Sequence, residues 1–341
     1  MVEVTEKATL DAARQLEETA KLAESAGDLD RALGFYRGLG QIEPKNPVWE
    51  FQAVRLLRAS GRGKEAAEAL RQALRKFPRA NTRADIKALV PELDPTDEQH
   101  RQALGDDCPP DEALKRTPIE DDGSSDVIIG RGSRKAAVIM FTGLADRMVM
   151  PLPLFDRYLS ELDLTSIFLR DRKRIGFFHG VSSLGDDYES TLSKLGQMLR
   201  EMGIETVHTI GNSAGGMAAL SYGIDLEAET ILGFSAPVSL SREAADMDRR
   251  TSVFAQRILS TVPEERRDLR ARLGALKTPP KVRLYYGEEM PEDRYHAESL
   301  KGAPGVTLHG LPGLTGHGAL FRMADTNGLR PLFRELYGEA D

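Results

Sequence analysis

The chain has 341 residues, of which 40% are hydrophobic and 29% charged, and its formal net charge is −7. This length suffices for about two domains with their own hydrophobic cores, and the composition is typical of a folded globular protein rather than a disordered one. The excess negative charge disfavours non-specific binding to nucleic acid or to anionic membranes. The single cysteine, Cys108, excludes an internal disulfide framework and fits a reducing compartment.

Neither a signal peptide nor a membrane span is expected. The first twenty residues, MVEVTEKATLDAARQLEETA, interleave charged and apolar side chains, so they lack the continuous apolar core of a signal peptide. No stretch approaches the roughly 18 apolar residues that a membrane-spanning helix requires. We therefore expect a cytoplasmic protein that binds neither nucleic acid nor membrane.

The first domain, predicted over residues 1–95, shows helical spacing of its apolar residues and an internal repeat. Two segments match at an offset of 34 residues, with the pairs Gly27 and Gly61, Ala32 and Ala66, Tyr36 and Leu70, and Pro44 and Pro78. Glycine permits a turn between helices, alanine permits close helix packing, and proline ends a helix. An offset of 34 is the tetratricopeptide period, and residues 8–90 resemble tetratricopeptide repeats. The resemblance implies a surface for a protein partner, for self-association or for the neighbouring domain.

Residues 96–124 are rich in acidic residues and proline, and they contain no apolar stretch long enough to form a core. Such a composition is typical of a solvated connection between domains. We therefore predict a linker over 96–124 and a second domain over 125–341.

The second domain alternates short β-branched runs with longer helical stretches. Strands are predicted at 126–130, 136–143, 165–171, 205–212, 229–236, 281–287 and 306–310, and helices at 186–203 and 215–223. This alternation is typical of an α/β fold, a mostly parallel sheet with helices on both faces. Residues 241–280 form a helical insertion between two strands and are a candidate lid.

A serine stands between glycines at the end of the fourth predicted strand. Gly211-Asn212-Ser213-Ala214-Gly215 fits the G-x-S-x-G pattern, in which a sharp strand-to-helix turn exposes a serine hydroxyl. Side chains at positions 211 and 215 would collide in such a turn, and Gly211 and Gly215 have none. In a parallel sheet, reactive groups gather at the carboxyl ends of the strands, which is where Ser213 lies.

Ser213 needs a base that removes its proton, usually a histidine oriented by a carboxylate. His317 lies in a glycine-rich loop after the last predicted strand and is the preferred base, with His179 as the second candidate. The carboxylate is expected in the loop after the strand at 281–287. Asp293 is preferred and Glu289 is the alternative, although Asp293 also suits the role of a helix N-cap.

The order Ser213, Asp293, His317 resembles the α/β-hydrolase superfamily over residues 125–338. The stretches LRDRKRIGFFHG, GNSAGGMAALSYG and ILGFSAPVSL look like a bacterial branch of serine esterase-like proteins. The resemblance implies an oxyanion hole made by the backbone N–H of Ala214 and by that of Leu144, in the loop after the second strand.

The residues together predict a serine hydrolase that cleaves a small-molecule ester or thioester through an acyl-enzyme. One alternative is a catalytically silent hydrolase-like adaptor, in a polysaccharide pathway for example, that uses its repeats to bind proteins. Another is an acyltransferase that uses the same triad. No metal-ligand spacing is present, so no metal and no cofactor are expected.

Overall fold

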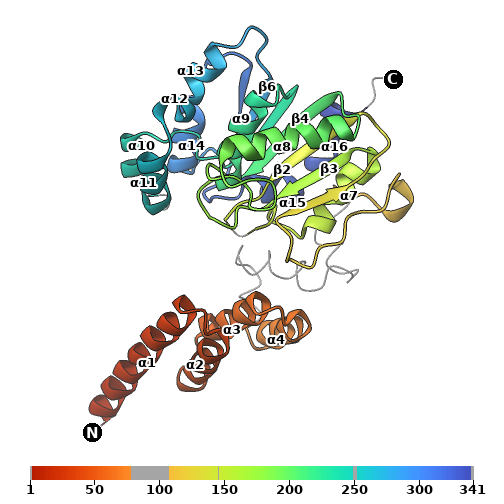
Figure 1. Cartoon of the computed structure of the whole chain (residues 1–341). Helices are drawn as coiled ribbons and strands as arrows, with labels where there is room; N and C mark the ends of the chain where they lie inside the picture. The colour runs from red at the N-terminus through yellow and green to blue at the C-terminus, as the bar shows by residue number, and fades with distance from the viewer. Residues whose placement is uncertain (1, 78–106, 145, 249–251, 339–341) are drawn as a thin grey trace. The chain divides into compact units, whose positions relative to one another are not determined.

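The computed structural model of the chain describes residues 2–77, 107–144, 146–248 and 252–338 (Figure 1). The chain divides into two compact units, Met1–Arg101 and Gln102–Asp341. Among the described residues, no helix is both long enough and apolar enough to cross a membrane.

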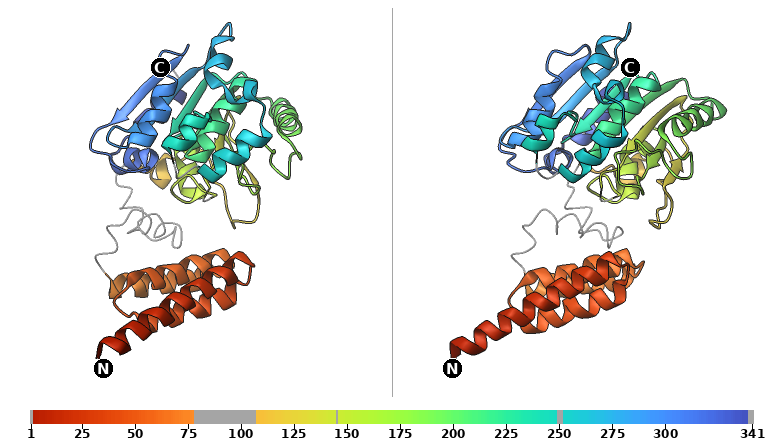
Figure 2. Two further views of the ribbon diagram at one scale, coloured as in Figure 1. Left: turned by 90° about the vertical axis from the view of Figure 1, so that its left-hand side faces the viewer. Right: turned by 60° about the vertical axis from the view of Figure 1, so that its left-hand side comes forward.

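The N-terminal unit consists of consecutive helices that pack side by side (Figure 2). They are α1 (Val2–Ser25), α2 (Leu29–Ile42), α3 (Pro47–Ala59) and α4 (Gly63–Lys76). The predicted repeat is confirmed by the two turns at equivalent positions, where Gly27 and Gly61 have φ of +78° and +75°. A side chain is strained in that conformation, which is why glycine recurs there. Ala32 and Ala66 are fully buried between helices, whereas Pro78 lies outside the described residues.

The C-terminal unit is built on a seven-stranded sheet with the order β1-β3-β2-β4-β5-β6-β7. The strands are β1 (Val127–Gly130), β2 (Ala136–Phe141), β3 (Thr165–Leu169), β4 (Thr206–Asn212), β5 (Thr230–Phe234), β6 (Lys281–Gly287) and β7 (Val306–Leu311). Each lies within or next to a predicted strand, so the predicted α/β fold is confirmed. All neighbouring strands are parallel except β1, which runs antiparallel to β3 at one edge.

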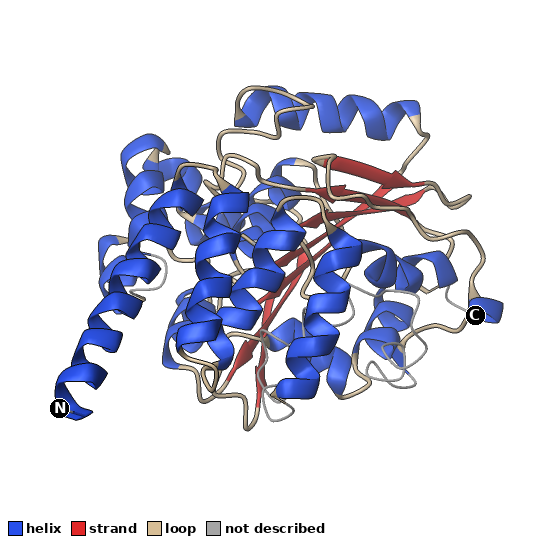
Figure 3. Cartoon of the chain, turned by 90° about the horizontal axis from the view of Figure 1, so that it is seen from below, coloured by secondary structure: helices blue, strands red, loops and turns tan. Residues whose placement is uncertain are grey.

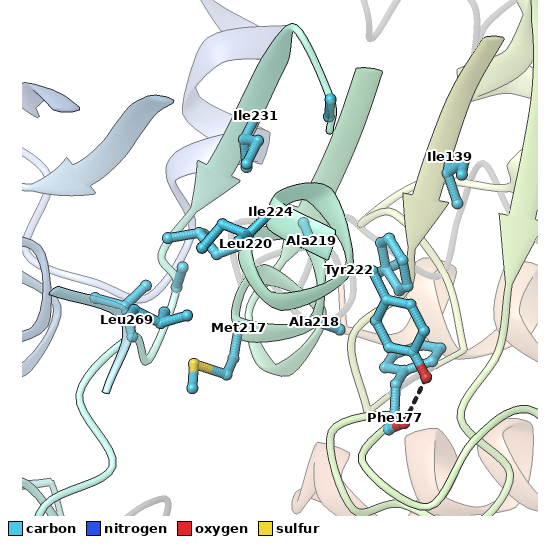
Figure 4. Close-up of a cluster of buried hydrophobic side chains, with 14 of the residues drawn as sticks. Ile139, Phe177, Met217, Ala218, Ala219, Leu220, Tyr222, Ile224, Ile231 and Leu269 are labelled. Carbon is cyan, nitrogen blue, oxygen red and sulfur yellow. Dashed lines mark hydrogen bonds between the residues drawn. The ribbon is translucent and has the colours of Figure 1, made fainter. Parts of the chain in front are cut away.

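Helices cover both faces of this sheet (Figure 3). The helices α8 (Tyr188–Glu201), α9 (Ala214–Asp225) and α13 (Leu269–Gly274) contribute to one core, and α7 (Leu152–Glu161), α15 (Ala319–Asp325) and α16 (Leu329–Tyr337) to the other. In the first core, α9 is buried along almost its whole length. Its Tyr222 hydroxyl donates to the Phe177 carbonyl at 3.0 Å (Figure 4). This packing fixes the helix that starts directly after Ser213.

The predicted insertion at 241–280 contains short helices. They are α10 (Arg242–Met247), α11 (Ser252–Thr261), α12 (Glu264–Arg267) and the already described α13. The next helix along the chain, α14 (Pro291–Ser299), contacts both β6 and α10. The role of the insertion at 241–280 as a lid stays a prediction.

Residues 107–124 differ from the solvated linker that the sequence predicts, because they pack against the C-terminal unit. The carboxylate of Asp107 is buried and accepts the backbone N–H groups of Leu329 and Arg330 at the start of α16. After the short 3-10 helix η3 (Asp111–Ala113), Arg116 forms an ion pair with Asp156 of α7 at 2.7 Å, with both side chains buried. Asp107 and Arg116 thus have buried partners more than thirty residues away, which local composition does not reveal.

His208 links the stability of the C-terminal unit to pH. It lies on β4, is 4% exposed and packs 4.6 Å from the ring of Tyr337. Burial lowers the pKa of His208 from 6.5 to about 4, since the charged imidazole loses its hydration. Between these values the unfolded chain binds more protons than the folded one, so the free energy of unfolding falls as the pH is lowered through this window.

Between about pH 7 and about pH 5, we predict that the free energy of unfolding of His208→Phe falls by about 2 kcal/mol less than that of the wild type. Urea unfolding followed by circular dichroism measures this difference. The N-terminal unit is the same in both proteins, so the difference belongs to the site on β4. An equal pH dependence in the two proteins would contradict the assignment.

Candidate active site

Ser213 occupies the turn between β4 and α9 with a backbone that few residues adopt. Its φ and ψ are +53° and −126°, a conformation that costs about 1–3 kcal/mol for a residue with a side chain. The Ser213 N–H donates to the Phe234 carbonyl at 2.9 Å, which ties the turn to the end of β5. The next residue, Ala214, begins α9. The turn therefore has the strand–serine–helix geometry that the G-x-S-x-G pattern predicts.

The two flanking glycines are required by close backbone packing. A Cβ atom at Gly211 would lie 2.1 Å from the carbonyl oxygen of Gly215. A Cβ atom at Gly215 would lie 2.1 Å from the carbonyl oxygen of Phe141, at the end of β2. Because backbone atoms on both sides prevent any easy shift, no other residue fits at either position. The turn around Ser213, here called the elbow, is thus packed directly against the end of β2.

The structure brings Ser213, His317 and Asp293 together. The Oγ of Ser213 is 2.8 Å from Nε2 of His317, and Nδ1 of His317 is 2.8 Å from Oδ1 of Asp293. The Nδ1–H of His317 donates to the carboxylate, which leaves Nε2 to accept the serine hydroxyl. The Asp293 side chain is 1% exposed, whereas that of His317 is 33% exposed. The carboxylate is thus shielded, and the base faces solvent where a substrate can approach.

Asp293 lies in the first turn of α14, after β6. The N-cap of this helix is Met290 and not Asp293, so Asp293 does not hold the alternative N-cap position. The positive end of the helix dipole favours a carboxylate at this place. The alternative acid, Glu289, is exposed in the turn before the helix. The second histidine candidate, His179, lies in the loop after β3, where its backbone carbonyl accepts from Lys173.

The loop after β2 approaches Ser213 from the other side. A Cβ atom at Gly143 would lie 3.5 Å from the Cβ of Ser213 and 3.3 Å from the Asn212 carbonyl oxygen. Leu144 follows directly, with a side chain that is 45% exposed. Ala214 is the first residue of α9, and the N–H groups of a first helical turn have no partner within the helix. Ala214 thus follows Ser213 directly, and Leu144 follows the glycine that packs against Asn212 and Ser213. Their role as oxyanion donors stays a prediction.

A buried arginine that the sequence analysis did not single out holds this loop. Arg170 follows β3, is 5% exposed at its side chain, and donates from Nε to the Asp146 carbonyl at 2.9 Å. Arg172 forms an ion pair with the Asp146 carboxylate at 2.9 Å. Asp146 and Val149 have φ of +59° and +62°, which is strained, above all for a β-branched residue. Two arginines thus fix a strained loop beside Ser213. Both lie in the stretch LRDRKRIGFFHG, but their contacts with Asp146 depend on the tertiary structure.

Among the described residues, no group of three or more His, Cys, Asp or Glu side chains is arranged to hold a metal ion.

Comparison with known proteins agrees with the two-unit architecture. Residues 23–103 match the profile of the tetratricopeptide repeat family. No curated protein matches the chain. The helices of the N-terminal unit from residue 23 onward are thus similar to tetratricopeptide repeats.

Solved structures similar to the chain include an α/β hydrolase enzyme from a sediment metagenome of the Mar Chica lagoon in Morocco, with 16% identity and a TM-score of 0.42 over 64% of this chain and 98% of that one. The esterase domain of a Rhodothermus marinus protein has 13% identity and a TM-score of 0.42, over 62% and 93%. A putative esterase from Staphylococcus aureus has 13% identity and a TM-score of 0.44, over 78% and 93%. The strand order, the antiparallel β1 and the elbow after β4 give the C-terminal unit the α/β-hydrolase fold.

Gly287 packs between the loops that carry Asp293 and His317. A Cβ atom at Gly287 would lie 2.5 Å from the Leu314 carbonyl oxygen and 3.1 Å from the Cβ of Met290. Any larger residue must therefore push the segment before His317 away from the start of α14.

We predict that Gly287→Ala slows labelling of Ser213 by a fluorophosphonate about 10- to 100-fold, because small misplacements of reacting groups carry such costs. The matched control is Gly316→Ala in the loop of His317, where a Cβ atom meets nothing within 4 Å. Rates of labelling measured side by side test the prediction. Equal rates for the two variants would show that the Gly287 contact does not set the geometry.

Proposed function

We propose that the chain is a serine hydrolase that cleaves a carboxylic ester or thioester through an acyl-enzyme. The observation that carries the proposal is the unbroken chain of contacts from Ser213 through His317 to the buried carboxylate of Asp293, at 2.8 Å each. Ser213 also lies on a strained turn at the end of a parallel strand. Polar contacts that serve only the stability of a fold rarely coincide with such a position. The α/β-hydrolase fold agrees with this function, and the chemistry is argued from the site.

In the acylation step, His317 accepts the proton of the Ser213 hydroxyl as Oγ attacks the carbonyl carbon of the substrate. Asp293 keeps the imidazole in the tautomer whose Nε2 faces the serine, and it stabilises the imidazolium that forms. The carbonyl oxygen gains negative charge, which the N–H groups of Ala214 and Leu144 stabilise. The bond from the carbonyl carbon to the leaving oxygen or sulfur then breaks. His317 donates its proton to that atom, which leaves as an alcohol or thiol, and the acyl ester of Ser213 remains.

In the second step, a water molecule takes the place of the leaving alcohol or thiol and hydrolyses the acyl-enzyme. His317 takes a proton from a water molecule, whose oxygen attacks the acyl carbon, and then returns a proton to Oγ of Ser213 as the acid is released. The 33% exposure of the His317 side chain leaves room for that water. An acceptor alcohol in place of water would give acyl transfer with the same residues.

The N-terminal unit is proposed to bind a protein partner or a second copy of the chain. Helical repeats of this type present extended surfaces rather than catalytic groups. The proposed reaction needs only residues of the α/β-hydrolase unit.

We predict that a fluorophosphonate labels the wild type and that Ser213→Ala abolishes the labelling, since only Ser213 has a base within hydrogen-bond distance in the proposed site. Turnover of p-nitrophenyl esters and acyl-CoA thioesters of increasing chain length then sizes the acyl pocket. A wild type that is labelled no faster than Ser213→Ala and turns over no member of the panel would favour the adaptor function.

A second prediction separates the two acids. Asp293→Asn is expected to lower kcat on the order of 10³- to 10⁴-fold, because the amide no longer fixes the productive tautomer of His317. Glu289→Gln, an isosteric change of an exposed side chain four residues earlier, is expected to leave kcat within about twofold. Steady-state kinetics on the best ester measures both. Equal losses, or a larger loss for Glu289→Gln, would refute the assignment of Asp293.

A further inference from the structure

The end of β5 and the turn that follows it contact Ser213 and, through Ala319, the end of the loop that carries His317. The Phe234 carbonyl accepts the Ser213 N–H at 2.9 Å. The next residue, Ser235, donates its backbone N–H to the Tyr285 carbonyl of β6 at 2.8 Å. The residue after that, Ala236, packs so closely that a Cβ atom at Gly216 of α9 would lie 2.3 Å from its Cβ. Three consecutive residues thus connect the elbow with the neighbouring strand.

Ser235 is buried and strained. It is 2% exposed, and its φ is +46°, a region that residues with a side chain rarely occupy. Strain of this kind persists only where surrounding contacts enforce it, and it is concentrated at functional sites. Glycine would adopt this backbone without cost.

The hydroxyl of Ser235 caps the helix that follows the base. The Ala319 N–H donates to Oγ of Ser235 at 3.1 Å in a buried contact. Ala319 is the first residue of α15, and its N-cap, Gly318, has no side chain that could satisfy this N–H group. Ser235 therefore takes the place of a local cap. Ala319 stands two residues after His317, so the cap fixes the C-terminal end of the loop that carries the imidazole.

We infer that Ser235 is a positioning residue that holds His317 against Ser213. The inference rests on the proposed function, and it adds a residue to which the sequence pattern assigns no role. The Phe234 carbonyl fixes the amide of the nucleophile, and the adjacent Ser235 hydroxyl fixes the loop of the base. The spacing of Ser213 and His317 is set by this single turn. The hydroxyl of Ser235 is buried, and it does not touch the reacting atoms.

The test uses two variants that both lose the hydroxyl, of which only Ser235→Gly also relieves the backbone strain. Ser235→Ala keeps the unfavourable φ, whereas Ser235→Gly relieves it, so the Gly variant is expected to melt about 2–4 °C above the Ala variant. Both are expected to be labelled by a fluorophosphonate about 10- to 100-fold more slowly than the wild type, and at similar rates. A residue that only supports stability would give labelling rates that follow the melting temperatures. Wild-type labelling of Ser235→Gly would overturn the inference.

A matched control removes the cap of a helix that carries no residue of the proposed site. Asp187 accepts the Ser190 N–H at 2.8 Å and caps α8. Asp187→Ala is expected to lower the melting temperature and to leave the labelling rate of Ser213 unchanged. A rate that falls as far as in the Ser235 variants would show that any lost cap has the same effect, which would overturn the specific role of Ser235.

A second readout needs no reaction and separates this inference from the proposed function. The Nδ1 proton of His317, held by Asp293, is expected to give a downfield proton resonance in the NMR spectrum of the full chain, assigned by its loss in His317→Gln. Both Ser235 variants are expected to lose or broaden this resonance. If the wild type resists labelling, the proposed function fails while the resonance still tests the positioning. An unchanged resonance in Ser235→Gly would overturn the inference, whatever the labelling shows.

Discussion

The positive φ of Ser213 is the constraint on which the rest of the site depends. A serine in this conformation is tolerated only because α9 and the ends of β2, β4 and β5 hold it from several sides. The flanking glycines are the consequence, since their missing side chains let α9 approach the carbonyl of Phe141 and let the turn close on itself. The buried packing of α9 along the sheet resists the relaxation that the strain would otherwise drive. The Ser213 hydroxyl is thereby held at the carboxyl end of β4.

The proposed acid and base reach Ser213 from separate loops, and each loop is fixed by contacts outside itself. Asp293 is carried by the first turn of α14, and His317 by a loop in which Gly316 is exposed and Gly318 is half-buried. Close packing between Gly287 and Leu314 holds these two loops together. The loop of His317 is therefore fixed at both ends while its imidazole is partly exposed to solvent. This suits the proposed role, in which the imidazole meets substrate, leaving group and water in turn.

Buried charges fix the remaining borders of the α/β-hydrolase unit. Arg170 holds the strained loop after β2, and the Arg116–Asp156 pair holds the segment that precedes β1 against α7. Such pairs are expensive to desolvate, and removing one partner alone leaves a buried charge uncompensated. They act as specific attachment points more than as sources of stability. Asp107 does the same for the start of α16, so the chain is already part of the α/β-hydrolase unit well before its first strand.

The alternation of strands and helices, the repeat of 34 residues and the pattern around Ser213 can all be predicted from the residues. Periodicity and turn glycines act over a few residues, so the sequence shows them directly. The residues also place His317 and Asp293 ahead of His179 and Glu289 as candidates. Which carboxylate meets the imidazole depends on the folded chain, since Glu289 and Asp293 stand four residues apart and differ in whether the chain turns them toward His317. The antiparallel edge strand, the packing of residues 107–124 and the strained Ser235 likewise depend on partners far along the chain, where a local reading of the residues has no signal.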